Sequence, residues 1–137
     1  MKLRGRKISP GKAEGEVMAS REEITFLGGV DPRTGIVTER GHELEGKCIS
    51  GKILVFPSGK GSTVGSYILY QLKKNGRAPV GIINEKADET VAVGAIISGI
   101  PMLDSLEAGT FKILKNKMRV KIDADRGYLE VDYAGSL

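Results

Sequence analysis

The sequence contains one cysteine, one histidine and no tryptophan, and only 5% of its 137 residues are aromatic. The single thiol, that of Cys48, excludes a disulfide within the chain, and with His42 as the one histidine the chain lacks the ligands of a zinc finger. An iron–sulfur cluster ordinarily requires about three or four thiolates. We therefore expect this chain to bind no metal ion and no cluster by itself.

Long apolar segments are missing as well, since no run approaches the ~20 apolar residues that a membrane-spanning helix needs. The amino terminus, residues 1–7, is basic, but no apolar segment follows it as in a secretory signal. The length suits one globular unit with a core of its own. We expect a single domain over residues 1–137 that is soluble and cytoplasmic and has no membrane contact.

A strong charge imbalance is missing too, because 21 Lys and Arg residues are interleaved with 17 Asp and Glu residues, for a formal net charge of +4. The densest basic residues alternate with apolar ones, which is typical of the exposed side of a hairpin. These residues are Lys112, Lys115, Lys117, Arg119 and Lys121. A nucleic-acid site more often combines a concentrated basic patch with stacking aromatic residues. We expect no nucleic-acid partner, and the charge equally suits anionic small substrates.

Glycine is abundant, with 19 residues, and the central segment of the chain is a glycine-rich turn over residues 56–67. Residues 52–56 form a short apolar run with β-branched members, which predicts a buried strand. Apolar residues from Val64 to Leu72 recur at helical spacing. The predicted order is strand, glycine loop, helix.

The glycine loop has the outline of an anion-binding site. Gly59 and Gly61 allow a tight turn and close approach of a ligand, and Ser62 or Thr63 stands where an N-cap hydroxyl belongs. The free N–H groups and the positive dipole end of a helix attract a carboxylate or a phosphate. A nucleotide-binding P-loop is disfavoured, because Gly61 separates Lys60 from Ser62 where that motif joins Lys directly to Ser or Thr. The same residue types also occur in strand–helix turns that bind nothing.

Two further polar residues stand in predicted loops. Asp31 belongs to a sharp loop over residues 28–35, in which Pro32 fixes its own φ and favours extended geometry at Asp31. Histidine titrates near neutral pH, which makes His42 a candidate acid or hydrogen-bond donor. The loop of Asp31 is also compatible with a connecting role alone, and a loop histidine beside glycine is more often a surface residue.

The remaining pattern predicts a mixed α/β fold. Residues 80–83 fit a buried parallel strand, which completes a strand–helix–strand unit with the central helix. A second short helix opens with acidic residues at Asp88 and extends to Ile97. Antiparallel segments flank this centre. They are an opening hairpin over residues 2–20 and strands near 110–114, 117–122 and 127–132, with a turn at 125–127. We predict a small central βαβ sheet with antiparallel hairpins and with helices on one side.

Several separated motifs occur together along nearly the whole chain. They comprise Gly28, Gly29, Val30, Asp31 and Pro32, Thr34 and Gly35, His42 and Leu44, residues 52–56, Gly61 and Ser62, Ser66, Tyr67 and Leu69, and Gly99, Ile100 and Pro101. Together these motifs resemble the swivel domain of the aconitase X family. The resemblance implies a swivelling β/β/α domain. It also implies a hydro-lyase with two kinds of subunit, in which the large subunit carries a [4Fe-4S] cluster.

The reaction that the resemblance implies is dehydration of (R)-5-phosphomevalonate to trans-anhydromevalonate 5-phosphate, in an archaeal mevalonate route to isoprenoids. Loss of water from a β-hydroxy acid requires removal of a proton next to the carboxylate while the hydroxyl group leaves. By the resemblance, Ser62 is the proton acceptor, and this chain is active only with its large subunit. We expect the substrate's anionic groups to contact Lys60, Gly61, Thr63 and Ser66, and the facing loop to be shaped by Asp31 and His42.

The same loop and the same charges are compatible with three other functions. A related dehydratase that acts on another hydroxy acid, such as cis-3-hydroxyproline, would carry the same motifs. A non-catalytic module would use the helix terminus to hold an anion or a partner, and it would bind its ligand without a second subunit. A nucleic-acid-binding protein would use the basic hairpin, and its affinity for DNA or RNA would depend strongly on salt.

Overall fold

The computed structural model describes residues 1–60, 64–109 and 111–132 of the chain. Within these residues the chain forms eight strands, three α-helices and one short 3-10 helix. The strands are β1 (Lys2–Arg4), β2 (Arg6–Ser9), β3 (Lys12–Ala19), β4 (Ile53–Phe56), β5 (Gly81–Asn84), β6 (Met102–Asp104), β7 (Arg119–Asp123) and β8 (Tyr128–Asp132). The helices are α1 (Phe26–Gly29), α2 (Gly65–Lys74), α3 (Glu89–Ser98) and the 3-10 helix η1 (Phe111–Ile113).

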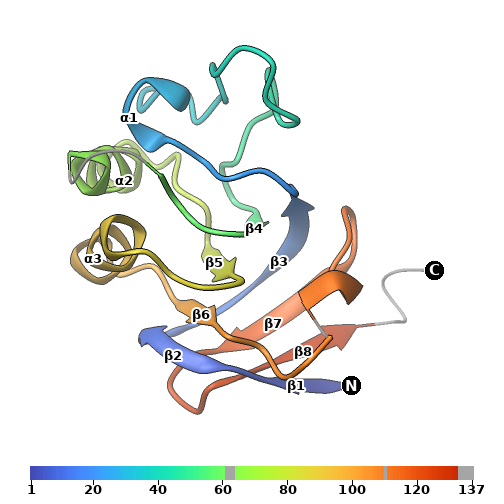
Figure 1. The fold of residues 1–137 in the computed structure, drawn as a ribbon. Helices are drawn as coiled ribbons and strands as arrows, with labels where there is room; N and C mark the ends of the chain where they lie inside the picture. Colours follow the sequence, from blue (N-terminus) through green and yellow to red (C-terminus); the bar gives the residue numbers. More distant parts are fainter. Residues whose placement is uncertain (61–63, 110, 133–137) are drawn as a thin grey trace.

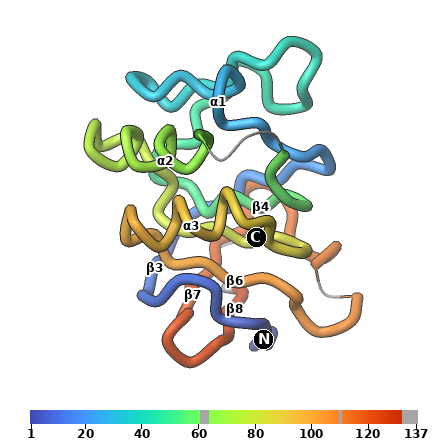
Figure 2. The backbone as a smooth tube through the Cα atoms, turned by 60° about the vertical axis from the view of Figure 1, so that its left-hand side comes forward, coloured from blue at the N-terminus to red at the C-terminus, as the bar shows by residue number. Residues whose placement is uncertain are grey.

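The centre of the fold is a run of parallel strands joined by helices. β3, β4, β5 and β6 lie side by side in parallel, and α2 and α3 connect β4 to β5 and β5 to β6. The predicted strand–helix–strand unit is therefore confirmed, whereas β6 is an addition that the sequence pattern did not predict. The three helices lie in one layer on one side of this sheet (Figures 1 and 2).

The parallel strands are buried on both faces, so their side chains alternate between two cores. Leu54 and Phe56 of β4 belong to the core beneath the helices. Ile53 and Val55 belong to a second core, which β7 and β8 complete from the other side. The molecule therefore has three layers, helices, parallel sheet and antiparallel sheet, as Figure 1 shows. The expected mixed α/β fold with helices on one side is confirmed.

The strand order corrects the predicted opening hairpin. The full order is β1-β8-β7-β3-β4-β5-β6-β2, so β2 and β3 do not pair with each other. β2 pairs with β6, and β3 pairs with β7 on one side and β4 on the other. β1 and β2, separated only by Gly5, lie at opposite ends of this order. The sheet is therefore curled so that its two edges meet at the amino terminus.

The carboxyl-terminal third of the chain contains one further correction. The segment near 110–114, predicted as a strand, contains the 3-10 helix η1. The next strand begins at Arg119 rather than at residue 117, because Lys117 has a left-handed backbone with φ of 73°, which a strand cannot contain. Lys112 and Lys115 therefore do not lie on a hairpin, whereas Arg119 and Lys121 do, and both approach Glu14 of β3.

The two longest helices have recognisable ends. Asp88 caps α3 by accepting hydrogen bonds from the N–H groups of Thr90 and Val91, and Gly99 ends the helix with φ of 67°. The predicted acidic start of this helix is confirmed. α2 and α3 have ten residues each, about 15 Å in length. Within the described ranges, no helix has the length and apolar character to cross a membrane.

Candidate active site

The candidate site lies at the edge of the sheet where the parallel strands β3, β4 and β5 end. In parallel sheets this carboxyl edge is the usual place for ligands, because the connecting loops gather there. The described residues that follow these three strands are 20–25, 57–60 and 85–88. The second of these ranges belongs to the glycine loop singled out in the sequence.

The start of the glycine loop is held on both sides. On one side, Ile24 donates its N–H to the carbonyl of Ser58 at 3.2 Å, and Lys60 donates its N–H to the carbonyl of Ile24 at 3.1 Å. On the other side, the N–H of Gly59 donates to Oδ1 of Asp88, the cap of α3, at 3.1 Å. Up to Lys60 the loop is therefore fixed to the segment after β3 and to the start of α3.

Position 59 requires glycine because the backbone of the loop approaches α3 closely there. Gly59 is buried, and a Cβ atom at this position would lie 2.5 Å from Cγ2 of Val91 and 2.8 Å from Oδ1 of Asp88. Its backbone is not in the left-handed region, so the need for glycine here is spatial. Gly61, Ser62 and Thr63, the remaining predicted residues of this loop, lie outside the described residues.

The helix that follows, α2, is preceded by a residue that already has a helical backbone. Val64 stands before the first helical residue with φ of −63° and ψ of −22°, and its side chain caps nothing. The expectation that Ser62 or Thr63 caps the helix concerns residues outside the described ranges and stays a prediction. Helical residues begin at Gly65, where a Cβ atom would lie 3.0 Å from Cγ2 of Thr90. Close packing against α3 therefore favours glycine at position 65.

Two predicted substrate contacts flank the undescribed residues. Lys60 is exposed on one side of them, and Ser66 is buried, with 7% of its surface accessible, in the first turn of α2. A Cβ atom at Gly94 of α3 would lie 3.2 Å from the Cα atom of Ser66, so this turn of α2 packs directly against α3. The structure thus presents a lysine in solvent and a serine at a helix–helix contact.

His42 is buried beside the site and holds two backbone segments together. Its Nε2 atom lies 2.9 Å from the carbonyl oxygen of Glu23, and its Nδ1 atom accepts the N–H of Leu44 at 3.0 Å. With Nδ1 as the acceptor, the donor to the carbonyl of Glu23 is Nε2. Glu23 precedes Ile24, which anchors the glycine loop, so His42 lies where it supports this edge. Both ring nitrogens are occupied by backbone groups, which leaves neither directed at a substrate.

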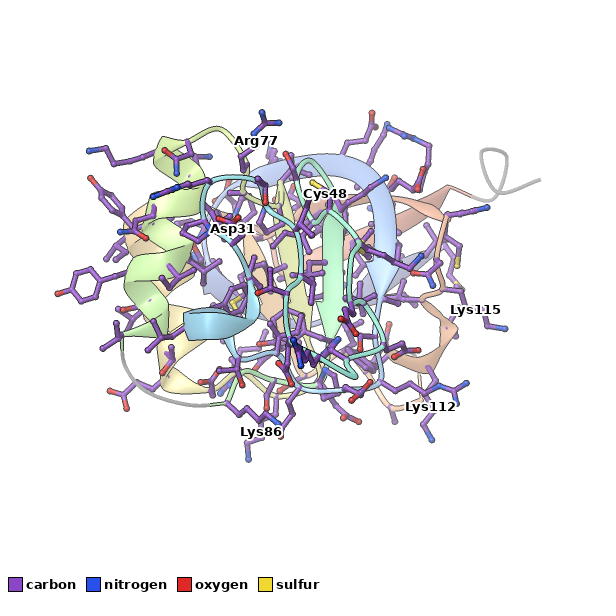
Figure 3. The ribbon with its side chains drawn as sticks, turned by 90° about the horizontal axis from the view of Figure 1, so that it is seen from above. Asp31, Cys48, Arg77, Lys86, Lys112 and Lys115 are labelled. Atoms are coloured by element: carbon purple, nitrogen blue, oxygen red, sulfur yellow. The ribbon has the colours of Figure 1, made fainter. Side chains whose placement is uncertain are left out.

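Asp31 lies at the opposite edge of the sheet. Its carboxylate accepts the N–H of Arg33 at 2.9 Å, and the neighbouring carbonyl of Pro32 accepts a hydrogen bond from Asn75, which caps the far end of α2. Figure 3 shows Asp31 near Arg77 and away from Lys86, which follows β5 at the site edge. The structure therefore does not bring Asp31 together with Lys60.

The residues of this chain do not fit an iron–sulfur cluster. Cys48 is exposed and lies near Asp31 and Arg77, away from the edge that carries Lys86 (Figure 3). Its thiol is 3.4 Å from the carbonyl oxygen of Thr34. In the part of the chain that the structure describes, no group of three or more His, Cys, Asp or Glu side chains could hold a metal ion. We therefore assign no chemical step of this chain to a metal.

Sequence reasoning missed a carboxylate that organises the loops at this edge. Glu43, next to His42 in the chain, accepts hydrogen bonds from the hydroxyl of Ser20 at 3.0 Å and from the N–H of Arg21 at 2.8 Å. The Arg21 N–H contributes most to keeping the pKa of Glu43 below its usual value, against the effect of partial burial. No local pattern indicates this role, because Ser20 and Glu43 are far apart in the sequence.

Asn84 was also missed, although it ends an apolar run with a polar residue. It is fully buried at the end of β5 and pairs in register with Phe56, so its side chain points to the helix side of the sheet. Its Nδ2 atom donates to the carbonyl of Phe56 at 3.0 Å, which holds the start of the glycine loop, while its Oδ1 atom has no partner among the described residues. A buried free acceptor is unusual and marks this position for a donor.

The layered arrangement of helices, a parallel sheet and a second antiparallel layer, with its loops gathered at one edge, is that of a swivelling β/β/α domain. The chain belongs to the aconitase X swivel domain family, whose family model matches residues 2–131.

Its relatives include subunits of a dehydratase. The phosphomevalonate dehydratase small subunit of Methanosarcina acetivorans is 59% identical over 131 residues, which cover 96% of this chain and 91% of the relative. The phosphomevalonate dehydratase small subunit of Thermococcus kodakarensis is 58% identical over 131 residues, which cover 96% of this chain and 96% of the relative. The crystal structure of Thermococcus kodakaraensis aconitase X in its holo-form matches with a TM-score of 0.91 at 57% identity, covering 96% of this chain and 98% of that one. The expected swivel-domain fold is thereby confirmed.

Proposed function

We propose that this chain is the small subunit of a phosphomevalonate dehydratase, a hydro-lyase that consists of two kinds of subunit. The observation that carries this proposal is the identity of 58% and 59% with curated small subunits over 96% of the chain. The family match and the shared fold agree with it. The name small subunit implies a large partner subunit, without which we expect no activity.

The proposed reaction removes water from (R)-5-phosphomevalonate. A proton leaves the carbon next to the carboxylate, the hydroxyl group leaves the neighbouring carbon, and a double bond forms between the two carbons. The products are trans-anhydromevalonate 5-phosphate and water. Ser62 accepts the proton, and Lys60, Gly61, Thr63 and Ser66 bind the substrate's anionic groups.

A serine needs strong support to act as a base. The positive end of a helix stabilises a nearby negative charge by at most about 2 kcal/mol, which increases the acidity of a hydroxyl group by a factor of about 30. α2 begins three residues after Ser62, and Lys60 stands two residues before Ser62. The stabilisation that one helix end and one exposed lysine give to a negative charge is smaller than a serine alkoxide requires at neutral pH. Cationic groups of the large subunit supply the rest, which is the physical reason to expect an inactive isolated chain.

The family's iron–sulfur cluster belongs, in this proposal, to the large subunit. Cys48 is the one thiol of this chain and lies away from the site edge, so the chain supplies no set of cluster ligands. The role of this chain is to position Ser62, bind the substrate and close one side of the site. Asn84 and His42 hold the loops that flank Ser62, through the carbonyls of Phe56 and Glu23.

The test is dehydration of (R)-5-phosphomevalonate by this chain alone and after anaerobic reconstitution with the large subunit of the same organism. We expect turnover only in the mixture. Ser62→Ala should lower kcat at least 100-fold, because a positioned base contributes about 10²–10⁴ in rate. Thr34→Ala is the matched control and should keep wild-type turnover, because its hydroxyl lies in the loop that carries Asp31, where it accepts the N–H of Ile36 at 3.1 Å.

Two outcomes would contradict the proposal in different ways. Wild-type turnover of Ser62→Ala in the mixture would exclude Ser62 as the proton acceptor. No turnover of phosphomevalonate by a mixture with an intact cluster would exclude this substrate. A panel of other hydroxy acids, including cis-3-hydroxyproline, would then identify the dehydratase.

A further inference from the structure

A cavity of about 870 Å³ lies at the same edge of the sheet as the glycine loop. Its walls come mainly from the end of β3, the end of β4 and the segment that contains η1, and the loops with Glu43 and Glu85 complete them. Pro57, which follows β4 and begins the glycine loop, is one of its lining residues. The cavity and the candidate active site therefore share a wall.

The walls of this cavity are joined by hydrogen bonds. The N–H of Ser20 donates to the carbonyl of Val55 at 2.8 Å, which fixes the end of β3 to β4. The side chain of Asn116 accepts the N–H of Ala19 at 2.6 Å, which fixes the segment after η1 to β3. Pro57 is held as well, because its carbonyl accepts the N–H of Glu85 at 3.0 Å. The cavity is thus a preformed part of the fold.

Three cationic side chains line the cavity, namely Arg21, Lys112 and Lys115. Each of them is exposed, and none forms a salt bridge with another described residue. The cations of the nearby hairpin differ, because Arg119 and Lys121 are both within salt-bridge distance of Glu14. The cationic groups around the cavity are therefore exposed to a ligand, and the charge of Arg21 also acts on Glu43.

Two carboxylates, those of Glu43 and Glu85, also line the cavity. Glu43 is engaged by the hydroxyl of Ser20 and the N–H of Arg21, which satisfies one of its oxygens. The backbone of Arg21 is thereby anchored while its guanidinium group remains exposed. With three cations against two carboxylates, the charged lining has a net charge of +1. The remaining lining, such as Val55 and Leu114, is apolar.

We propose that this cavity binds the phosphate end of the substrate through Arg21, Lys112 and Lys115. The proposal rests on the proposed function, in which the substrate has a carboxylate at one end and a phosphate at the other. Ser62 acts next to the carboxylate, so in this proposal the residues around Ser62 contact that end of the substrate, and the cavity cations hold the phosphate at a distance from it. Arg and Lys donors are the groups that proteins use for phosphate, with arginine giving two parallel hydrogen bonds.

The first test uses the full chain without its partner and inorganic phosphate as the probe. Amide and side-chain NMR signals of Arg21, Lys112 and Lys115 are followed while phosphate is added at constant ionic strength, with chloride as the reference anion. We expect saturable shifts confined to the cavity lining. Replacement of all three residues by Gln should abolish these shifts. Saturable shifts elsewhere, or none at these three residues, would overturn the proposal.

A matched control variant replaces three exposed cations at the opposite end of α2, Lys73, Lys74 and Arg77, by Gln. It changes the net charge of the chain by the same amount and should keep the phosphate shifts of the wild type. Equal loss of the shifts in both variants would mean that only the net charge matters, which would contradict a site. Retained dispersion of the amide spectrum verifies that each variant is folded.

The second test uses the reconstituted enzyme and separates this proposal from the proposed function. The cavity variant should raise KM for (R)-5-phosphomevalonate about tenfold or more, with kcat changed less than about threefold, because the lost contacts bind substrate and transition state alike. An unchanged KM in an active enzyme would overturn the cavity proposal and leave the function standing. An inactive wild-type mixture would overturn the function, and the phosphate titration would still decide whether the cavity binds the anion.

Discussion

The buried carboxylate of Asp104, at the end of β6, joins three segments of the chain. Arg6 of β2 donates from Nε to Oδ1 at 2.9 Å and from Nη2 to Oδ2 at 2.7 Å. The N–H of Ala87 donates to Oδ2 at 2.8 Å. Ala87 lies in the loop after β5, at the edge of the candidate site. One side chain therefore ties the edge strand β2 and a loop of the site to the core.

These hydrogen bonds make the stability of the fold depend on pH. Burial opposes ionisation of Asp104, but the donors from Arg6 and Ala87 outweigh it, so the pKa of this carboxyl group lies below its usual value. A carboxylate with a lowered pKa stabilises the fold above its unfolded pKa, about 3.9. This contribution is lost as the pH falls from there through the folded pKa.

We expect Asp104→Asn to lower the free energy of unfolding at pH 7 by about 2 kcal/mol, because a charged acceptor of several hydrogen bonds is lost. The difference between this variant and the wild type should shrink as the pH falls below about 4. Urea unfolding at several pH values between 7 and 2 measures both effects. Glu85→Gln, at an exposed carboxylate outside the helices, should keep the pH dependence of the wild type. An Asp104→Asn curve parallel to that of the wild type would exclude the assigned role.

At the scale of elements, α2 and α3 form a parallel pair that positions the first turn after the glycine loop. A Cβ atom at Gly94 would lie 2.6 Å from Cδ1 of Leu69 and 3.2 Å from the Cα atom of Ser66. The two helix backbones can approach this closely because α3 has glycine at the contact. The position of Ser66, a proposed substrate contact, therefore depends on a residue of the neighbouring helix.

We expect Gly94→Ala to destabilise the chain by about 1–3 kcal/mol through overpacking, although alanine favours a helix by about 1 kcal/mol. When Leu69 is also replaced by Ala, the methyl group added at position 94 gains space. Gly94→Ala should then destabilise the chain by at least about 1 kcal/mol less. Urea unfolding of the two single variants and the double variant measures this coupling. Gly99→Ala changes a residue with positive φ and open surroundings, and it should cost about 1 kcal/mol in either background. Additive effects of Gly94→Ala and Leu69→Ala would contradict the packing argument.

At the scale of the whole molecule, the curled sheet brings its edge strands together at one residue. Gly5 joins β1 to β2, and its N–H donates to the carbonyl of Gly127 at 2.9 Å. A Cβ atom at Gly5 would lie 2.8 Å from Cδ2 of Leu106 and 3.0 Å from the carbonyl oxygen of Asp104. The two edges of the sheet therefore meet at Gly5, where the packing leaves no room for a side chain.

We expect Gly5→Val to lower the free energy of unfolding by about 1–3 kcal/mol, because the backbone of Asp104 cannot move away as a flexible side chain could. For a chain of this length the loss corresponds to a decrease in Tm of several degrees, measurable by calorimetry. Ala108→Val, at an exposed position in a nearby loop, adds the same apolar bulk and should leave Tm almost unchanged. Equal melting temperatures of Gly5→Val and the wild type would contradict a tight crossing at this glycine.

The elements that were predicted correctly are those whose signals are local. The apolar runs of β4 and β5, the helical spacing of α2 and the acidic start of α3 each lie within about ten neighbouring residues. The pairing of β2 with β6 joins Arg6 to Asp104, and periodicity carries no information about a partner that far away in the chain. A hairpin was therefore predicted where two strands are close in sequence but belong to different parts of the sheet.

For the site, the sequence by itself determined the order of strand, glycine loop and helix, and the absence of cluster ligands, because both depend on residue type and on neighbours in the chain. Only the tertiary structure decided that His42 and Glu43 lie beside the glycine loop while Asp31 lies at the opposite edge. It also decided that Arg21 and Lys112 face one cavity. The physical reason is that the strand order and the hydrogen bonds between distant segments determine which loops meet, and neither is encoded in a local pattern.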